Sequence, residues 1–221
     1  MKITNLKKKI GEFSLHIEEM DIPFGGIYGI IGSNGCGKTT TMKIIARLLA
    51  PDSGHIDYEN LTQRDITMVF RKPYLLHDTV VKNLLYPLLL RKTTPDMARV
   101  EHFLEIAGLQ NCRDQYAPGL SGGQQQKLAM IRAMIFSPKL ILIDEAFSNL
   151  DTESIDAFER LILETNRTES TTFVICSHQI AHIQRLCGKI FFMKDGFIDE
   201  DRGVSPHTHE LFEKSSTKTL I

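Results

Sequence analysis

The stretch "GIYGIIGSNGCGKTT", residues 26–40, decides the fold, because an apolar run passes into a glycine-rich loop and then into a helical pattern. Residues 26–32 are typical of a strand buried on both faces of a parallel sheet. Residues 32–40 match the phosphate-binding pattern G-x-x-x-x-G-K-[ST] in full, in the strand-to-helix context that this P-loop motif requires. Lys38 would reach the β- and γ-phosphates of a nucleotide, and the Thr39 hydroxyl would hold Mg²⁺. We therefore predict a nucleotide site rather than an ordinary glycine-rich turn. Its expected contact residues are Gly32, Ser33, Asn34, Gly35, Cys36, Gly37, Lys38, Thr39 and Thr40.

Two further apolar runs, "KLILIDE" at 139–145 and "TTFVICSH" at 171–178, predict two more buried strands. Helical patterns lie at about 38–49 and 152–166. Strands that alternate with helices favour an α/β fold with a mostly parallel sheet.

The two ends and the middle of the chain have different patterns. Residues 13–17 alternate apolar and polar side chains, which predicts a half-buried antiparallel strand. Residues 190–201 predict a hairpin that turns at Asp195-Gly196. The segment 77–136 lacks clear strand patterns, so we expect a helical subdomain inserted in the α/β core. The residues after about 203 are polar, and we expect a loosely held tail.

The composition is that of an ordinary globular protein, with 221 residues, 26 Lys plus Arg and 27 Asp plus Glu, so its charge gives no indication of a nucleic-acid partner. Four cysteines without C-x-x-C pairing favour a reducing compartment. No apolar run approaches the ~18 residues that span a bilayer, and the N-terminus does not read as a signal peptide. A role at a membrane would therefore depend on a partner.

A second candidate anion site lies in "GLSGGQQQKLAM", residues 119–130. Ser121 is a favoured helix N-cap residue, and Leu128, Ile131 and Ile135 follow at helical spacing. The backbone N–H groups near Gly122 would then lie at the positive end of a helix. These residues alone do not indicate which anion this second cradle binds.

Polar residues follow the two later buried strands, at the sheet edge where ligands bind in an open α/β sheet. Asp144 is in the position of a carboxylate that holds a metal ion, and Glu145 could orient or deprotonate an attacking water. The alternative is an acidic pair that faces solvent. His178 ends the next strand, where a histidine is either structural or catalytic. His207 and His209 have no further ligand pattern, and we expect both to be solvated.

These motifs together resemble the ATP-binding cassette family. The P-loop, "LSGGQ" at 120–124, "LILIDE" at 140–145, "SNLD" at 148–151 and His178 occur in the order and spacing of that family, over about residues 1–200. The resemblance implies a P-loop NTPase core, an N-terminal antiparallel β subdomain and the inserted helical subdomain, all within one nucleotide-binding domain, 1–221. It also implies that two cassettes pack head to tail, as a homodimer, so that the second cradle of one holds the γ-phosphate of the other's ATP.

The resemblance assigns roles residue by residue. Glu145 would be the catalytic base, assisted by Lys38 and by His178, which contacts the γ-phosphate. Thr39 and Asp144 would hold Mg²⁺. The residues that reach the partner's nucleotide across the dimer interface would be Ser121, Gly122, Gly123 and Asp151.

Two positions depart from the family's pattern. Arg71 stands where the family has a glutamine that helps to coordinate Mg²⁺, and arginine offers only donors. Arg71 could pair with the γ-phosphate or face solvent. The family's aromatic residue that stacks on adenine falls here on Ile10, and Phe13 nearby could replace it.

The resemblance favours an ATPase subunit that energises separate permease subunits from the cytoplasmic face of the membrane, with ATP, Mg²⁺ and a solute-binding protein but no nucleic acid. The segment "YLLHDTVVKNLLYPLL", residues 74–89, resembles the region that docks on membrane subunits. This segment and the compact N-terminus are similar to cassettes of tungstate- and molybdate-type oxoanion importers. Two alternatives stay open: a cassette without a transport role, and a cassette that binds ATP but hydrolyses it poorly.

Overall fold

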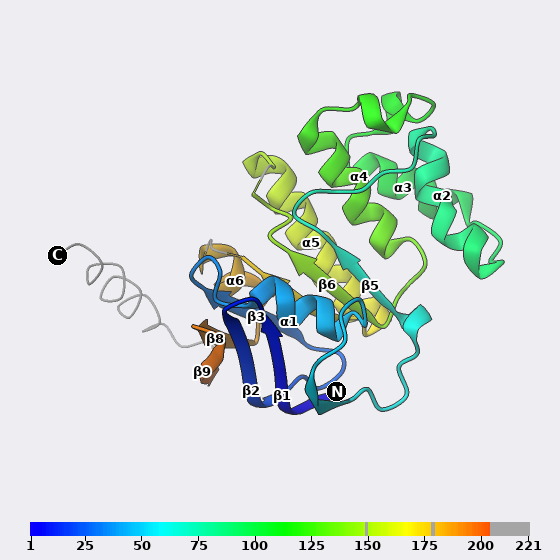
Figure 1. Cartoon of the computed structure of the whole chain (residues 1–221). Coiled ribbons are helices and arrows are strands. Elements are labelled where there is room, and N and C mark those ends of the chain that lie inside the picture. The colour runs from blue at the N-terminus through cyan, green and yellow to red at the C-terminus, as the bar shows by residue number, and fades with distance from the viewer. Residues whose placement is uncertain (149, 178–179, 204–221) are drawn as a thin grey trace.

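The computed structural model describes residues 1–148, 150–177 and 180–203, and in these residues nine strands form a single sheet (Figure 1). The strands are β1 (Lys2–Ile10), β2 (Phe13–Asp21), β3 (Ile27–Gly32), β4 (Ser53–Asp57), β5 (Ile66–Val69), β6 (Leu140–Asp144), β7 (Thr172–Cys176), β8 (Lys189–Lys194) and β9 (Phe197–Gly203). Their order in the sheet is β4-β1-β2-β9-β8-β3-β7-β6-β5.

The strand that precedes the glycine-rich loop lies inside the parallel part of the sheet. β3 pairs in parallel with β7 on one side and β8 on the other, and β6 pairs in parallel with β7 and β5. All residues of β6 and β7 are buried, as their apolar runs predict. The predicted α/β fold with a mostly parallel sheet is confirmed, and the loop leaves the sheet between two neighbouring strands.

The N-terminal strands extend this sheet with antiparallel pairs. β1 pairs antiparallel with β2 and β4, so the predicted N-terminal antiparallel region is confirmed. The predicted hairpin is formed by β8 and β9, with Asp195 and Gly196 in the turn. Its turn contacts the glycine-rich loop, because the Gly196 amide donates to the Cys36 carbonyl oxygen at 3.0 Å.

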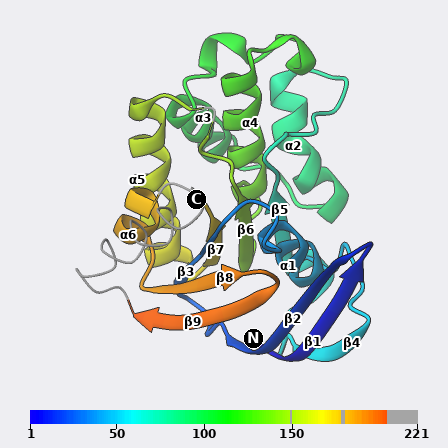
Figure 2. The ribbon, with the colours of Figure 1, turned by 60° about the vertical axis from the view of Figure 1, so that its left-hand side comes forward.

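Two apolar clusters lie on opposite faces of the central strands. Along β6, Leu140 and Leu142 belong to a cluster with the N-terminal strands, whereas Ile141 and Ile143 belong to a cluster with the larger helices. This alternation follows from the two-residue period of a strand. Helix α1 (Lys38–Ile45) lies between the N-terminal strands and the parallel strands of the sheet, which Figures 1 and 2 both show.

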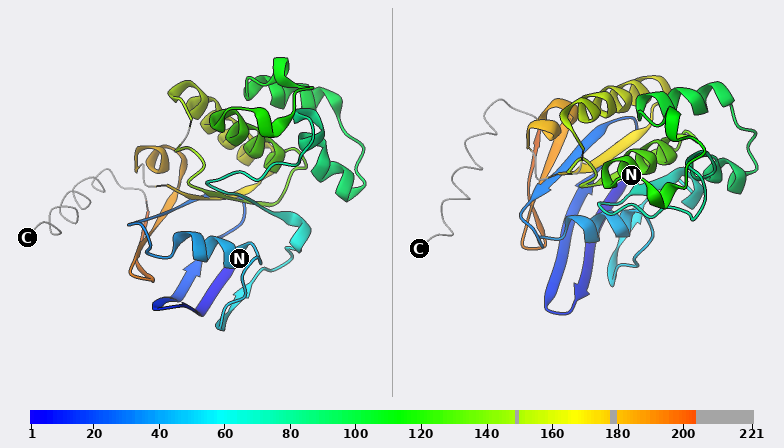
Figure 3. Two further views of the ribbon diagram at one scale, coloured as in Figure 1. Left: turned by 45° about the horizontal axis from the view of Figure 1, so that its top comes forward. Right: turned by 90° about the horizontal axis from the view of Figure 1, so that it is seen from above.

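The segment 77–136 is mostly helical, as expected. It contains α2 (Val80–Arg91), with Pro87 inside it, α3 (Met97–Ile106) and α4 (Gly122–Met134), with short 3₁₀ turns at Gln110–Cys112 and Ala117–Gly119. These helices gather at the end of the molecule away from β1, β2 and β4 (Figures 2 and 3). The other helices are a 3₁₀ turn at Gln63–Asp65, α5 (Thr152–Glu169) and α6 (Ile180–Leu186). Over the described residues, none of the helices has the length and apolarity needed to cross a bilayer.

Candidate functional site

The glycine-rich loop ends at a helix N-terminus that no side chain caps. Gly37 is the N-cap of α1, with a φ of 114° and no side-chain hydrogen bond. A side chain at this φ would be strained, so the conformation favours glycine. A Cβ atom on Gly32 would collide with the Met193 carbonyl oxygen and would lie 2.6 Å from the Cys36 Sγ. Close packing at Gly32 and backbone conformation at Gly37 therefore both require glycine.

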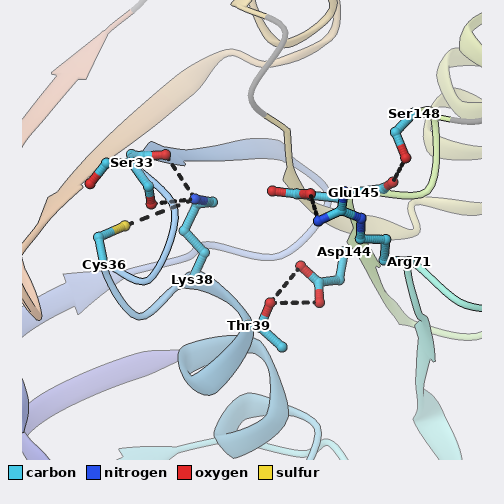
Figure 4. A network of polar contacts seen from close by, with 9 residues as sticks. Ser33, Cys36, Lys38, Thr39, Arg71, Asp144, Glu145 and Ser148 are labelled. Atoms are coloured by element: carbon cyan, nitrogen blue, oxygen red, sulfur yellow. Dashed lines mark hydrogen bonds and ion pairs between the residues drawn. The ribbon is translucent and has the colours of Figure 1, made fainter. Parts of the chain in front are cut away.

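Lys38 is buried within this loop, with 5% of its surface exposed. Its Nζ donates to the carbonyl oxygens of Gly32 at 2.7 Å and Ser33 at 2.9 Å (Figure 4). The ammonium group is thus held inside the curve of the loop, where a phosphate group would meet a fixed positive charge beside the N-terminus of α1.

Thr39 and Asp144 meet across the site, although 105 positions separate them. The Thr39 hydroxyl lies 2.8 Å from one Asp144 carboxylate oxygen and 3.1 Å from the other (Figure 4). Burial raises the pKa of the Asp144 carboxyl, the nearby Glu145 charge adds to the rise, and the Thr39 hydrogen bond opposes it. A hydroxyl and a buried carboxylate are hard oxygen donors, so this pair fits Mg²⁺, which binds few protein ligands together with phosphate oxygens.

Glu145 has an unusual backbone conformation, with a φ of 50°. Left-handed backbone is uncommon outside glycine, and it often marks a functional site. The turn is fixed on both sides: the Glu145 amide donates to the Cys176 carbonyl oxygen at 2.9 Å, and the Ser148 hydroxyl donates to the Glu145 carbonyl oxygen at 3.0 Å. The chain therefore turns sharply after β6, and the Glu145 side chain lies among the site residues (Figure 4).

Arg71, whose role the sequence leaves open between phosphate and solvent, forms an ion pair with Glu145. Its Nη1 lies 3.2 Å from the Glu145 Oε2, although 62% of the Arg71 side chain is exposed, against 9% of Glu145 (Figure 4). The position that departs from the family's pattern is therefore part of the site.

One cavity of about 790 Å³ is lined by Gly37, Lys38, Thr39, Arg71, Asp144 and Glu145, together with Asn34, Gly35 and Thr40 of the predicted loop. Phe13 lines this cavity, whereas Ile10 does not and is 48% exposed, so the geometry favours Phe13 as the residue that stacks on a base. Sequence reasoning missed three lining residues, Lys43, Phe70 and Lys72. The helical period does put Lys43 about one turn after Thr39, a signal that was available in the sequence.

The second cradle is a helix N-terminus that its own side chains cap. Ser121 is the N-cap of α4, as predicted, and its Oγ accepts from the Gln124 amide at 3.3 Å. The Gln124 side chain in turn accepts from the Ser121 amide at 3.0 Å, which completes a capping box. Ser121 and Gly122 are exposed.

Of the remaining predicted residues, Asp151 is the N-cap of α5, and its Oδ1 accepts from the Ser154 amide at 2.8 Å. Its other carboxylate oxygen lies 3.7 Å from the Lys127 Nζ. His178, His207 and His209 lie outside the described residues.

Comparison with known proteins identifies the family of the chain. Residues 15–148 match the family model described as ABC transporter. The chain is 35% identical over 208 residues to the tungstate uptake system ATP-binding protein TupC of Peptoclostridium acidaminophilum, covering 91% of this chain and 97% of TupC. It is 33% identical to the methionine import ATP-binding protein MetN of Histophilus somni, covering 100% of this chain and 68% of MetN.

Among solved structures, the dimeric post-hydrolysis state of the ATP-binding cassette MJ0796 bound to ADP and Pi is similar, with a TM-score of 0.81 and 28% identity, over 92% of this chain and 98% of that one. The chain therefore belongs to the ABC transporter family, and its fold is that of an ATP-binding cassette.

Proposed function

We propose that this chain binds and hydrolyses ATP to energise the transport of a solute by separate membrane subunits. The observation that carries the proposal is one cavity in which Lys38, the Thr39–Asp144 pair and Glu145 converge. Lys38 binds the phosphates, Thr39 and Asp144 hold Mg²⁺, which neutralises phosphate charge when bound, and Glu145 accepts a proton from water. His178 contacts the γ-phosphate in the same proposal.

We further propose that two copies of the chain pack head to tail. The second cradle, at Ser121, Gly122 and Gly123, then contacts the γ-phosphate of ATP bound to the partner, and Asp151 lies at the interface. Exposure of Ser121 and Gly122 supports this arrangement, as does the dimeric form of the related cassette MJ0796.

Permease subunits bind the surface around α2 in this proposal, which places the chain at the cytoplasmic face of the membrane. Three large apolar side chains of α2 are exposed, at helical spacing: Tyr86, Leu89 and Leu90. Exposed apolar groups that gather on one surface mark interaction sites. A neighbouring hollow of about 480 Å³, lined in part by Leu76, Leu85 and Tyr86, is available to a partner segment.

The base is tested with Glu145→Gln, which keeps the shape of the side chain and removes its ability to accept a proton. The ATPase rate should fall about 10²–10⁴-fold, while ATP affinity is retained and an ATP-bound dimer accumulates in size-exclusion chromatography. Glu105→Gln, at an exposed position of α3, is the matched control and should leave the rate unchanged. A Glu145→Gln protein with near-normal turnover would exclude Glu145 as the base.

For the solute, we propose an oxoanion of the tungstate type, delivered by a solute-binding protein. The match to TupC over almost the full length of both chains supports this choice, and the match to MetN makes methionine the competing candidate. Cells that lack this chain should lose tungstate accumulation and keep methionine uptake. The opposite result would assign the system to methionine.

A second candidate is a cassette that binds ATP but hydrolyses it slowly. The Arg71–Glu145 ion pair favours it, because arginine occupies the carboxylate that has to accept the proton. Steady-state ATPase measurement on the complex with its membrane subunits distinguishes the two candidates.

A further inference from the structure

The pairing of two neighbouring strands brings Arg71 to Glu145. β5 and β6 run in parallel, with Val69 opposite Ile143. Two residues after this pair, the backbone reaches Arg71 beyond β5 and Glu145 beyond β6. The contact is therefore set by strand register, although it joins an exposed guanidinium to a mostly buried carboxylate.

The ion pair stabilises the Glu145 carboxylate in its buried position. This carboxylate is mostly buried and adjoins Asp144, a second buried carboxylate. Like charges that share a buried site are unfavourable, and the Arg71 cation offsets part of this repulsion. Arginine can only donate, so while the pair persists the Arg71 guanidinium occupies a Glu145 carboxylate oxygen that an attacking water would otherwise contact.

A nucleoside triphosphate offers a competing anion in the same cavity. Arg71 lines the cavity together with Lys38 and Gly35 of the glycine-rich loop. Since 62% of the Arg71 side chain is exposed, its guanidinium can turn without disturbing the apolar core. A terminal phosphate carries more negative charge than a carboxylate and pairs with arginine in two-pronged geometry. A diphosphate lacks this terminal phosphate, so it offers Arg71 no competing anion at that position.

We propose that Arg71 is a positioning residue that binds Glu145 in the nucleotide-free chain and transfers to the γ-phosphate when ATP binds. Release of Glu145 is then coupled to the presence of a triphosphate, and ADP leaves the ion pair in place. This proposal rests on the proposed function, in which Glu145 is the base and the loop at 32–40 holds the phosphates.

A double-mutant cycle on nucleotide affinity tests the transfer. The four proteins are the wild type, Arg71→Met, Glu145→Gln and the double variant. Each is titrated with Mg²⁺ and either ATPγS or ADP, at a protein concentration below that at which size-exclusion chromatography shows a nucleotide-bound dimer. Arg71→Met removes the guanidinium, keeps the aliphatic stem and adds no metal ligand. In the wild-type background it removes both a phosphate contact and an ion pair that has to break. In the Glu145→Gln background it removes the phosphate contact alone.

Arg71→Met should therefore weaken ATPγS binding about two- to fivefold more in the Glu145→Gln background than in the wild-type background, a size that suits a partly exposed ion pair. With ADP the two backgrounds should respond equally. Lys72→Met is the matched control, because Lys72 adjoins Arg71 and lines the same cavity with the same charge. Its effect should be equal in both backgrounds.

Three results would overturn the proposal: no coupling with ATPγS, the same coupling with ADP, or the same coupling at Lys72. Thermal melting of each variant checks that it is folded. Failure of the proposed function would give different results: the chain would bind neither nucleotide, or Glu145→Gln would keep its turnover.

Discussion

The N-terminus of α1 and the N-terminus of α4 both lie at glycines of a sequence motif, yet the two helices begin in different ways. At α1 the N-cap is Gly37, which has no side chain to offer to the first amides. At α4 the N-cap is Ser121, and a reciprocal pair of hydrogen bonds with Gln124 satisfies two amides. The first end lies beside a large cavity, and the second is exposed.

This difference shows how two phosphate cradles on one chain can have separate tasks. The uncapped end leaves its first amides to a ligand, because Gly37 has no side chain that could accept from them. The capped end has the Ser121 and Gln124 amides satisfied without any ligand. A phosphate that accepts from either of these two amides has to displace or share the cap, which suits contact with a second molecule that brings its own binding energy.

The largest effect is expected where only the second cradle is changed. Ser121→Arg puts a large cation at the exposed start of α4, so it should lower ATP hydrolysis at least about 100-fold, the scale seen when a donor to a developing negative charge is lost. ATP affinity of the isolated chain should not change. Hydrolysis assays and nucleotide titration measure the two effects, with Glu105→Arg as the surface control. Loss of ATP affinity in the Ser121→Arg chain would mean that the two cradles are not independent.

A change in the first cradle, by contrast, should lower the ATP affinity of the isolated chain. Lys38→Met keeps the volume of a buried side chain and removes the cation, so ATP affinity of the isolated chain should fall about 10–100-fold, as expected for lost hydrogen bonds to a charged group. Lys43→Met changes an exposed lysine of the same cavity and should have a smaller effect. An equal loss in the two variants, measured by calorimetry, would assign the effect to general charge.

The same substitution should have opposite effects on the stability of the two helix starts. Gly37→Ala forces a side chain into a φ of 114° and brings its Cβ to about 3.0 Å from the Phe13 Cζ, so we expect a loss of about 2 kcal/mol in the free energy of unfolding. Gly122→Ala meets no atom within 4 Å and lies in the first turn of a helix, so it should be neutral or stabilising by up to about 1 kcal/mol. Urea titration measures both, and equal losses would contradict the comparison.

The smallest effect concerns the cap itself. Ser121→Ala removes the acceptor for the Gln124 amide, which should lower the free energy of unfolding by about 1 kcal/mol and the melting temperature by about 2–4 °C. Ser121→Asp keeps an acceptor and should melt close to the wild type. If Ser121→Ala melted at the wild-type temperature, the capping box would contribute nothing to the monomer.

Most of the fold could be predicted because continuous apolar runs mark strands that are buried on both faces. β3, β6 and β7 were predicted on this basis, and the β8–β9 hairpin was predicted from its Asp195-Gly196 turn. β1 was missed because a bulge breaks its alternation: Asn5 has a φ of 49°, and the register with β4 shifts between Thr4 and Lys7. Its buried Ile3 and Leu6 are consequently three positions apart. β4 was missed because four of its five residues are exposed and none is fully buried.

The site was predictable where a local motif carries it, as in the loop at 32–40 and in Asp144 at the end of an apolar run. The contact of Arg71 with Glu145 was not, because it depends on the register between β5 and β6, which no local pattern determines. Likewise, the left-handed backbone of Glu145 is held by a tertiary contact with Cys176 and a local contact with Ser148, neither of which its residue type predicts.

The place of β3 between β7 and β8 also has a consequence for folding during synthesis on the ribosome. A ribosome that has just made Gly32 must still make the chain as far as Thr172 before the first neighbour of β3 exists. At 5–20 residues per second this interval lasts roughly 7–30 s. Throughout it, both edges of an apolar strand are unpaired, and unpaired strand edges are open to aggregation. The pairs of β3 with β7 and β8, and with them the final position of the nucleotide loop, can therefore form only late in synthesis.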